Sequence, residues 1–348
     1  MLRRDRVFKA GSSIVSRLPD AQDPSSRRVR VGALAAAPSG FVDARDPKKL
    51  RLKDAVDRIV CGDAASVLKR LPREWCACAV TSPPYWNTVD YGISGQIGQG
   101  SYQAYLKQLS SVWKGVERCL LPNGKFCLNV PLLPLTKAVS EPAFGKTHTR
   151  VLLDQYSDIK AWVEKTTRLR LYSLYVWEKQ TTEKMFGSYP YPPNLYERNT
   201  IEFIAVFVKP GEPRKIPLKV KEASRLGQAE WLDLTRQVWW MYPENVRRQE
   251  GHPAPFPEAL PNRLINMYTF RAAASEGFEG DVVLDPLCGS GMTCVAARRL
   301  GRRFVGIDLN PEFCAYAAQR ARMTPVSPSV MSAARPSERK TSQGELAL

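Results

Sequence analysis

The sequence predicts an α/β fold built from repeated units of buried strand, loop and helix. Two stretches carry this prediction, because in each a short apolar run is followed by a turn and then by residues at helical spacing. One has a strand over 58–61 and a helix over 64–71; the other has a strand over 281–285, a glycine turn, a helix over 292–300, a strand over 303–308 and a helix from Pro311 to about residue 323. Ligands of such sheets bind beyond the carboxyl ends of the strands, so we expect the site in these loops.

The middle of the chain supplies the remaining elements of the predicted sheet. Tyr102, Tyr105, Leu109 and Trp113 recur at helical spacing, which predicts a buried face on a helix over 101–121. Proline and glycine at 122–124 end that helix. The expected strands cover 76–80, 125–130, 171–178 and 201–209.

Charge and composition divide the chain further. Its formal net charge of +17 favours a polyanionic partner, and we expect nucleic acid rather than an anionic membrane surface. Residues 1–50 carry 11 basic and 5 acidic side chains without a periodic pattern, which predicts a flexible arm. Residues 210–250 lack the pattern of the flanking strands and predict an insertion, whose tryptophans either pack on the main domain or contact nucleic acid. Residues 324–348 predict a disordered tail.

Cysteine and histidine usage predicts neither a disulfide scaffold nor a metal site. The chain has 8 cysteines, mostly in apolar contexts without a CxxC pair, and 2 histidines. Such cysteines are typical of core residues in a reducing cytoplasm. No apolar run approaches the ~20 residues that span a bilayer.

The stretch Thr81-Ser82-Pro83-Pro84-Tyr85-Trp86-Asn87 follows a predicted strand and is stiffened by its two prolines. Because proline has no N–H, the loop offers mainly acceptors, namely the Ser82 hydroxyl and the carbonyls of Ser82 and Pro83, beside the Tyr85 ring. An exocyclic amine on a planar ring needs acceptors for its N–H bonds as positive charge develops, and an aromatic ring that stacks on it. A rigid turn or a polyproline ligand is the alternative reading of this stretch alone.

A second segment with candidate functional residues runs from Asp285 to Gly291, and Asp308 lies at the end of the next strand. The glycines allow close approach to a helix N-terminus, and Asp308 can bind ribose hydroxyls. Cys294 stands where a dinucleotide fingerprint has its third glycine, so a pyrophosphate is not required. Asp285 repels phosphate but can pair with an α-amino group, which predicts S-adenosyl-L-methionine as the ligand. Asp63 lies after another strand, as a helix N-cap or a ligand contact.

Together with HPAPFPEALPNRLI from His252 to Ile265, these stretches resemble the β class of amino-group DNA methyltransferases, in which the catalytic motif precedes the cofactor motif. The resemblance spans about residues 56–322. It implies a Rossmann-like seven-stranded methyltransferase sheet of permuted order, with a catalytic half over 51–209, a target-recognition insertion over 210–250 and a cofactor-binding half over 251–323. The implied catalytic residues are Ser82, Pro83, Pro84 and Tyr85; the implied cofactor-binding residues are Asp63, His252, Pro253, Ala254, Pro255, Phe256, Asp285, Pro286, Gly289, Ser290, Gly291 and Asp308. Leu287-Cys288 departs from the family, which more often has Phe at the first of these positions.

The resemblance also implies double-stranded DNA as the partner, and as the reaction a direct displacement on a flipped base without a cysteine nucleophile. Ser82 at the first position of the tetrapeptide goes more often with cytosine N4 than with adenine N6, and we expect cytosine, with adenine as the alternative. An RNA methyltransferase and a non-catalytic nucleic-acid-binding protein are the further alternatives. The irregular segments 131–165, 180–200 and 210–250 are expected to read the DNA sequence. A homodimer and a cognate restriction endonuclease are conceivable partners.

Overall fold

The computed structural model describes residues 40–44, 50–87, 92–145, 150–179, 190–193, 195–243 and 256–327. Most of the predicted arm and tail lies outside these residues, as do His252 to Pro255. Within the described ranges, no helix has the length and apolar character needed to cross a bilayer.

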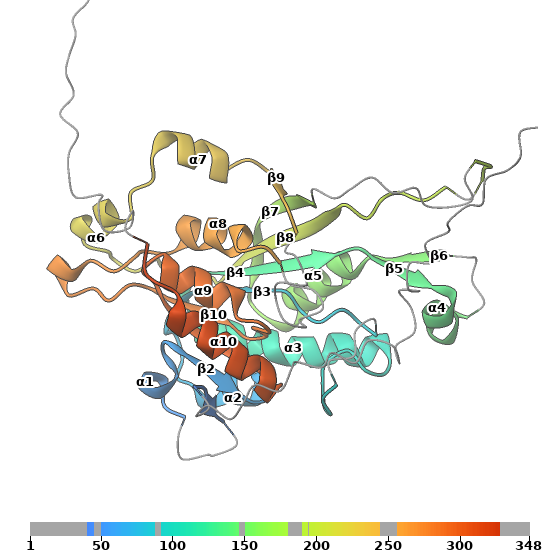
Figure 1. Cartoon of the computed structure of the whole chain (residues 1–348), viewed down its shortest axis with the longest axis horizontal. Coiled ribbons are helices and arrows are strands. Elements are labelled where there is room, and N and C mark those ends of the chain that lie inside the picture. The colour runs from blue at the N-terminus through green and yellow to red at the C-terminus, as the bar shows by residue number, and fades with distance from the viewer. Residues whose placement is uncertain are drawn as a thin grey trace, which may run out of the picture.

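A nine-stranded sheet forms the centre of the molecule (Figure 1). The first six strands in its order run parallel to one another, and β8 is antiparallel to both of its neighbours. In spatial order the strands are β1 (Val42–Asp43), β2 (Arg58–Cys61), β11 (Arg303–Asp308), β10 (Val282–Asp285), β3 (Cys76–Thr81), β4 (Leu120–Pro131), β8 (Ile201–Val208), β7 (Arg170–Lys179) and β9 (Val238–Met241). The two strands that come last in the sequence therefore lie inside the sheet, as the permuted order predicts.

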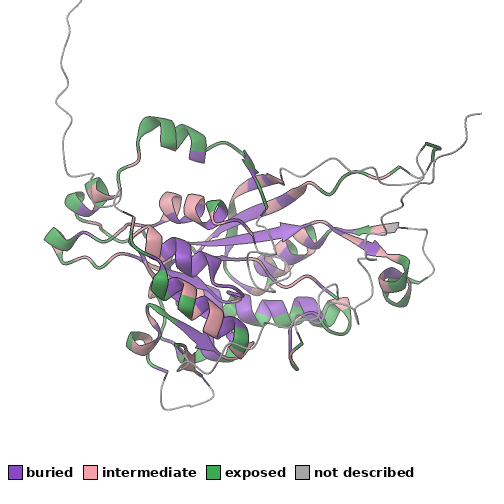
Figure 2. Cartoon of the chain, viewed as in Figure 1, coloured by how far each residue is buried: buried purple, intermediate pink, exposed green. Residues whose placement is uncertain are grey.

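Helices cover both faces of the sheet, and each face has its own apolar core. Trp113 and Ile159 belong to the core on the side of α2 (Ala64–Arg70), α3 (Tyr102–Cys119) and α5 (Gln155–Thr166). Leu264 and Ala317 belong to the core on the side of α8 (Ala259–Tyr268), α9 (Met292–Arg299) and α10 (Pro311–Met323). Figure 2 shows the buried strands between these layers. Burial on both faces explains why the parallel strands are continuous apolar runs in the sequence.

The remaining elements are short and lie outside this frame. They are α1 (Leu52–Ala55), the hairpin of β5 (Leu133–Thr136) and β6 (Arg150–Leu153), α4 (Lys137–Phe144), α6 (Leu218–Ala223), α7 (Gln228–Leu234) and the 3₁₀ helix η3 (Ala274–Glu276).

The structure confirms the predicted strands and helices and corrects the predictions for three other segments. Residues 1–50 were expected to form a flexible arm, which was wrong for Val42–Asp43, because they pair with β2 as strand β1. Residues 131–165 were expected to be irregular, which was wrong for α5, because its Ile159 and Val163 are buried in the core. The sheet has two strands beyond the predicted seven, because β1 and β9 extend its edges. The prediction that 210–250 stands apart from the sheet was wrong for β9, which pairs in parallel with β7. Four residues are too few for an alternating pattern to be distinctive. Trp239 of this strand is buried, whereas Trp240 is 60% exposed, so both proposed uses of the tryptophans remain open.

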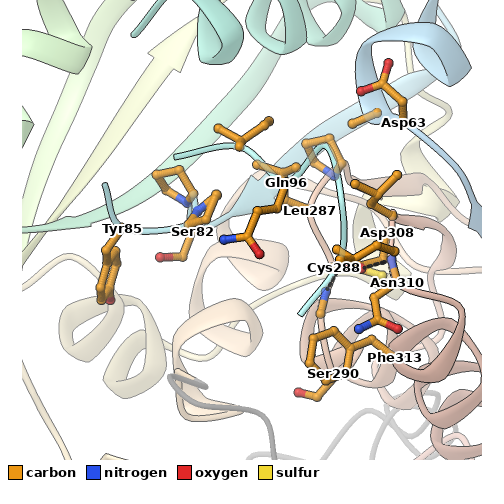
Figure 3. Close-up of a pocket in the computed structure, with 18 of the residues that line it drawn as sticks. Asp63, Ser82, Tyr85, Gln96, Leu287, Cys288, Ser290, Asp308, Asn310 and Phe313 are labelled. Carbon is orange, nitrogen blue, oxygen red and sulfur yellow. Dashed lines mark hydrogen bonds between the residues drawn. The ribbon is translucent and has the colours of Figure 1, made fainter. Parts of the chain in front are cut away.

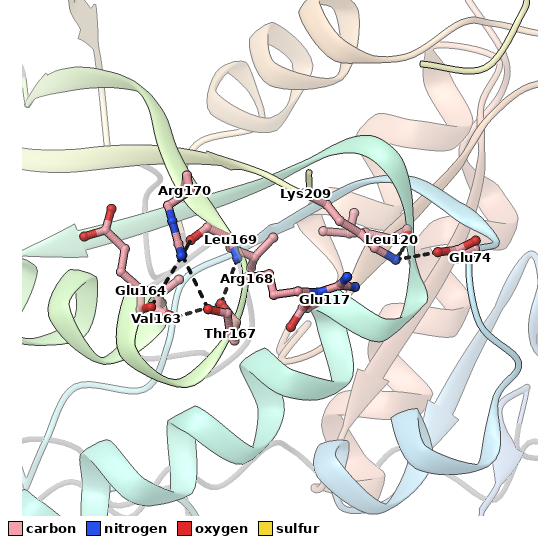
Figure 4. Close-up of polar contacts among 10 residues, drawn as sticks. All are labelled: Glu74, Glu117, Leu120, Val163, Glu164, Thr167, Arg168, Leu169, Arg170 and Lys209. Atoms are coloured by element: carbon pink, nitrogen blue, oxygen red, sulfur yellow. Dashed lines mark hydrogen bonds and ion pairs between the residues drawn. The ribbon is translucent and has the colours of Figure 1, made fainter. Parts of the chain in front are cut away.

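Charged side chains form contacts near the amino-terminal ends of the parallel strands β3 and β4, at the edge of the sheet away from the motif loops (Figure 4). Lys209, at the end of β8, has a buried side chain whose Nζ lies 3.0 Å from a Glu74 carboxylate oxygen and 2.7 Å from the Leu120 carbonyl oxygen. Arg168 and Glu117 form a second pair at 2.7 Å between the loop before β7 and helix α3. The Lys209 contacts join the end of β8 to the starts of β3 and β4, far from the loops at the opposite edge.

All eight cysteines are buried, as the sequence predicts for core residues. No cluster of three or more metal-ligating side chains occurs among the described residues.

Candidate active site

The predicted motif loops emerge where the strand order reverses. From the adjacent parallel strands β10 and β3, the chain continues through α9 to β11 on one side and through α3 to β4 on the other. The two loops after these strands therefore diverge and leave a crevice between them, which is where α/β sheets bind ligands. Ser82 follows β3, and Pro286 follows β10.

One cavity is lined by both loops (Figure 3). It encloses about 1000 Å³, including space open to solvent. The prediction that the two distant segments meet at one site is confirmed. Its lining comprises Asp63, Ala64, Ser82, Pro83, Pro84, Tyr85, Ile93, Gly95, Gln96, Ile97, Phe256, Pro286, Leu287, Cys288, Gly289, Ser290, Met292, Asp308, Leu309, Asn310 and Phe313.

The Ser82 hydroxyl is oriented by the neighbouring strand. It donates a hydrogen bond to the Asn129 carbonyl oxygen of β4 at 3.0 Å. Because its single proton is engaged there, the serine oxygen has only acceptor capacity to offer the cavity. The Tyr105 hydroxyl donates to the Pro84 carbonyl at 3.0 Å, which secures the other end of the diproline turn. The loop thus presents acceptors in a fixed geometry.

Asp285 is buried beneath the cofactor loop and does not line the cavity. One of its carboxylate oxygens accepts a hydrogen bond from the Leu287 N–H at 3.2 Å. Burial raises the pKa of Asp285 to about 6, although the Leu287 N–H and the nearby hydroxyls of Thr293 and Thr81 act in the opposite direction. Contact between Asp285 and a ligand amino group remains a prediction, because the carboxylate lies behind the loop.

Gly291 is also absent from the cavity wall, and the structure gives a packing reason for this glycine. Its φ of +78° lies in the left-handed region, and a Cβ here would come within 2.7 Å of the Ala317 Cβ on α10. Any side chain at this position would push α9 and α10 apart. Its predicted role in cofactor binding is therefore indirect at most.

Asp308 connects the ends of β10 and β11. Its two carboxylate oxygens accept hydrogen bonds from the N–H groups of Gly289 and Asn310, each at 2.8 Å. Burial raises the pKa of Asp308, and the same backbone donors partly offset this effect. The carboxylate fixes the cofactor loop and also lines the cavity.

The sequence suggested two roles for Asp63, a helix N-cap and a ligand contact, and its position in the structure suits both. Its side chain caps α2 by accepting a hydrogen bond from the Ser66 N–H at 2.9 Å, and it lines the cavity as well. Phe256 lines the cavity, whereas the other four residues predicted to close over the cofactor lie outside the described residues.

Sequence reasoning missed several lining residues, among them Gln96, Ile97, Asn310 and Phe313. The Asn310-Pro311 pair carried a usable signal, because Asn310 follows a strand and caps a helix by accepting from the Glu312 N–H at 2.9 Å. Gln96 had no such signal, since it is one polar residue in a polar, glycine-rich loop.

The cavity fits a nucleoside that carries a charged amino acid. Leu287, Ile97 and Phe313 supply apolar walls, and Asp308 supplies a carboxylate. The Gly289 N–H is occupied by Asp308, which matches the sequence argument that no pyrophosphate has to be held there.

Comparisons with known proteins agree with this fold and site. The model of the DNA methylase family with N6 and N4 amino specificity matches residues 76–319, and the chain belongs to this family of S-adenosyl-L-methionine-dependent methyltransferases. The type II methyltransferase M.XycI of Xanthomonas campestris pv. cyanopsidis is 29% identical, over 83% of this chain and 94% of that protein.

Solved structures resemble the chain over a similar span. The structure of TTHA0409, a putative DNA modification methylase from Thermus thermophilus complexed with S-adenosyl-L-methionine, is 32% identical, with a TM-score of 0.60 over 77% of this chain and 94% of that one. The cytosine-N4-specific PvuII DNA methyltransferase shares the fold at 18% identity, with a TM-score of 0.56 over 79% of this chain and 90% of that one.

Proposed function

We propose that this DNA methyltransferase transfers a methyl group to the exocyclic N4 of cytosine at specific sites in duplex DNA. The observation that carries the proposal is the cavity itself, which has Ser82 and Pro83 on one wall and the cofactor loop on another. S-adenosyl-L-methionine supplies an electrophilic methyl group on positively charged sulfur.

The chain contributes binding and orientation to the reaction. The Ser82 oxygen and the Pro83 carbonyl accept N–H bonds of the amine, and the Tyr85 ring stacks on the base. Transfer joins the methyl carbon to nitrogen through the nitrogen lone pair, leaves the electron pair of the broken carbon–sulfur bond on sulfur, and releases one amine proton to water. Because the loops must bring donor and acceptor within ~3–3.5 Å, the base has to leave the duplex.

The resemblance favours cytosine, because serine at the first position of the tetrapeptide goes more often with N4-cytosine. The short neutral side chain of Ser82 has room for the smaller pyrimidine and forms a single hydrogen bond to the amine. Adenine N6 is the alternative, because both bases present an exocyclic amine beside a ring nitrogen. Incubation of unmethylated duplex DNA with the protein and its methyl donor, followed by digestion to nucleosides and mass spectrometry, distinguishes them. N4-methylcytosine is expected, and N6-methyladenine would overturn the assignment of the base.

The surface around β9 is our candidate for DNA contact. Trp231 and Trp240 are each 60% exposed and Tyr242 is 75% exposed. Exposed aromatic rings on a chain with a net charge of +17 suit base stacking beside phosphate contacts. We further propose that the enzyme acts in the bacterial cytoplasm within a restriction-modification system, with a homodimer as a state to be tested by sedimentation.

A further inference from the structure

The loop over residues 92–100 places one buried polar side chain in the cavity. Ser94, Gly95 and Gln99 of this loop are exposed, whereas Gln96 is only 8% exposed and lines the cavity. An amide removed from water costs free energy unless it finds hydrogen-bonding partners, so a carboxamide buried on a cavity wall is held in a defined orientation.

Two hydrogen bonds attach this loop to the two residues that follow the catalytic tetrapeptide. The Asn87 N–H donates to the Gly98 carbonyl at 3.1 Å, and the Trp86 indole N–H donates to the Gly100 carbonyl at 3.0 Å. Gly98 has a φ of +106°, and a Cβ on it would touch the Tyr85 carbonyl oxygen at 3.6 Å. The loop that carries Gln96 is therefore positioned by the residues that directly follow the catalytic motif.

Gln96 lines the same cavity as Ser82 after β3 and the turn at Leu287 and Cys288 after β10. Figure 3 shows Gln96 reaching between Ser82 and the turn at Leu287 and Cys288. This is the space in which the amine of the base and the methyl group must meet if the proposed function is correct. A side chain here contacts the reacting groups or obstructs them.

We propose that Gln96 is a catalytic residue whose carboxamide oxygen accepts a hydrogen bond from the target amine. The inference rests on the proposed function. In the proposed function the two N–H bonds of the amine go to the Ser82 oxygen and the Pro83 carbonyl, and the Gln96 oxygen shares one of these N–H bonds as a third acceptor in the same cavity. Acceptors around the amine stabilise the positive charge that grows on nitrogen as it attacks. The carboxamide remains neutral throughout, and the released proton still passes to water.

Substitution of Gln96 separates this role from a structural one. Gln96→Leu keeps the approximate size and removes the acceptor, so single-turnover transfer to DNA should slow by about 100-fold, which is typical of losing one transition-state hydrogen bond. The dissociation constant of the methyl donor, measured by calorimetry, and the melting temperature should match the wild type. Gln99→Leu, at an exposed position in the same loop, is the matched control and should react at the wild-type rate.

Gln96→Glu distinguishes the acceptor from the donor group of the amide. This variant keeps a side-chain oxygen and loses the NH₂ group, so it should react faster than Gln96→Leu. If it is slower than Gln96→Leu, the amide acts as a donor and the proposal is wrong. If Gln96→Leu weakens donor binding and thermal stability as much as it slows transfer, Gln96 is a structural residue.

The wild-type reaction separates this inference from the function on which it rests. A long unmethylated duplex DNA with many sequence contexts serves as substrate. Wild-type protein that binds the methyl donor and methylates no DNA would refute the proposed function. Wild-type protein that methylates DNA, together with an equally fast Gln96→Leu variant, would refute only the role of Gln96.

Discussion

Asp285 makes the stability of the ligand-free protein depend on pH in a predictable direction. Its folded-state pKa of about 6 lies above the ordinary value of 3.8, chiefly because the carboxyl is buried. Because the folded state binds this proton more tightly than the unfolded state, protonation of Asp285 favours folding. This stabilisation is complete below about pH 4 and is lost as the pH rises through about 6. A difference of about two pKa units corresponds to about 3 kcal/mol, so ionised Asp285 should cost the folded state about that much.

Asp285→Asn removes this titration and keeps the size and polarity of the side chain. Relative to the wild type, the variant should therefore gain stability as the pH rises from about 4 to about 8, with most of an expected change of about 3 kcal/mol appearing across that range. Urea unfolding monitored by tryptophan fluorescence, without methyl donor, measures both proteins at each pH. The slopes against urea should agree between variants, so that the comparison reports stability.

Titrating groups that do not interact with Asp285 are common to both proteins and cancel in the difference, whereas the charge of Asp308 itself contributes to the raised pKa of Asp285. A stability difference that stays constant with pH, or that moves in favour of the wild type at high pH, would refute the reasoning. The latter result would show that the Leu287 N–H and the nearby hydroxyls of Thr293 and Thr81 favour the carboxylate by more than burial disfavours it.

Three further substitutions test separate parts of the account. Ser82→Ala removes the oriented acceptor and should slow single-turnover transfer about 100-fold while calorimetry gives an unchanged donor affinity; a normal rate would exclude Ser82 from the chemistry. Gly291→Ala places a methyl group against Ala317 at a positive φ and should lower the free energy of unfolding by about 2 kcal/mol in urea titrations, and wild-type stability would mean that α9 and α10 separate freely. Trp240→Ala should weaken DNA binding about 10-fold in an anisotropy titration without altering donor binding, since stacking contributes about 1–3 kcal/mol per base. Undiminished DNA affinity would place the DNA surface elsewhere.

The strands and the motif loops could be predicted from the sequence because their signals are local. Buried parallel strands are short apolar runs, and proline, glycine and aspartate mark the loops that follow them. These signals sufficed for Ser82 to Tyr85 and for Asp308, all of which line the cavity. They also sufficed for the permuted order, since motif order is a property of the chain itself.

The sequence did not distinguish residues that line the cavity from residues that support the cavity wall from behind. Asp285 and Gly291 belong to the same short motif as the cavity-lining Gly289 and Ser290. However, Asp285 is buried beneath the loop, and Gly291 packs against α10. Gln96 resembles the exposed Gln99 in sequence and differs from it only in burial.

The local pattern of residues determined which segments become strands and loops in this protein. The tertiary structure alone decided which side chains face the shared cavity, because that depends on the packing of elements about 200 residues apart in the chain, such as β3 against β10. It also decided that β9 joins the sheet, since valine and tryptophan favour extended structure but only pairing with β7 makes this short segment part of the sheet.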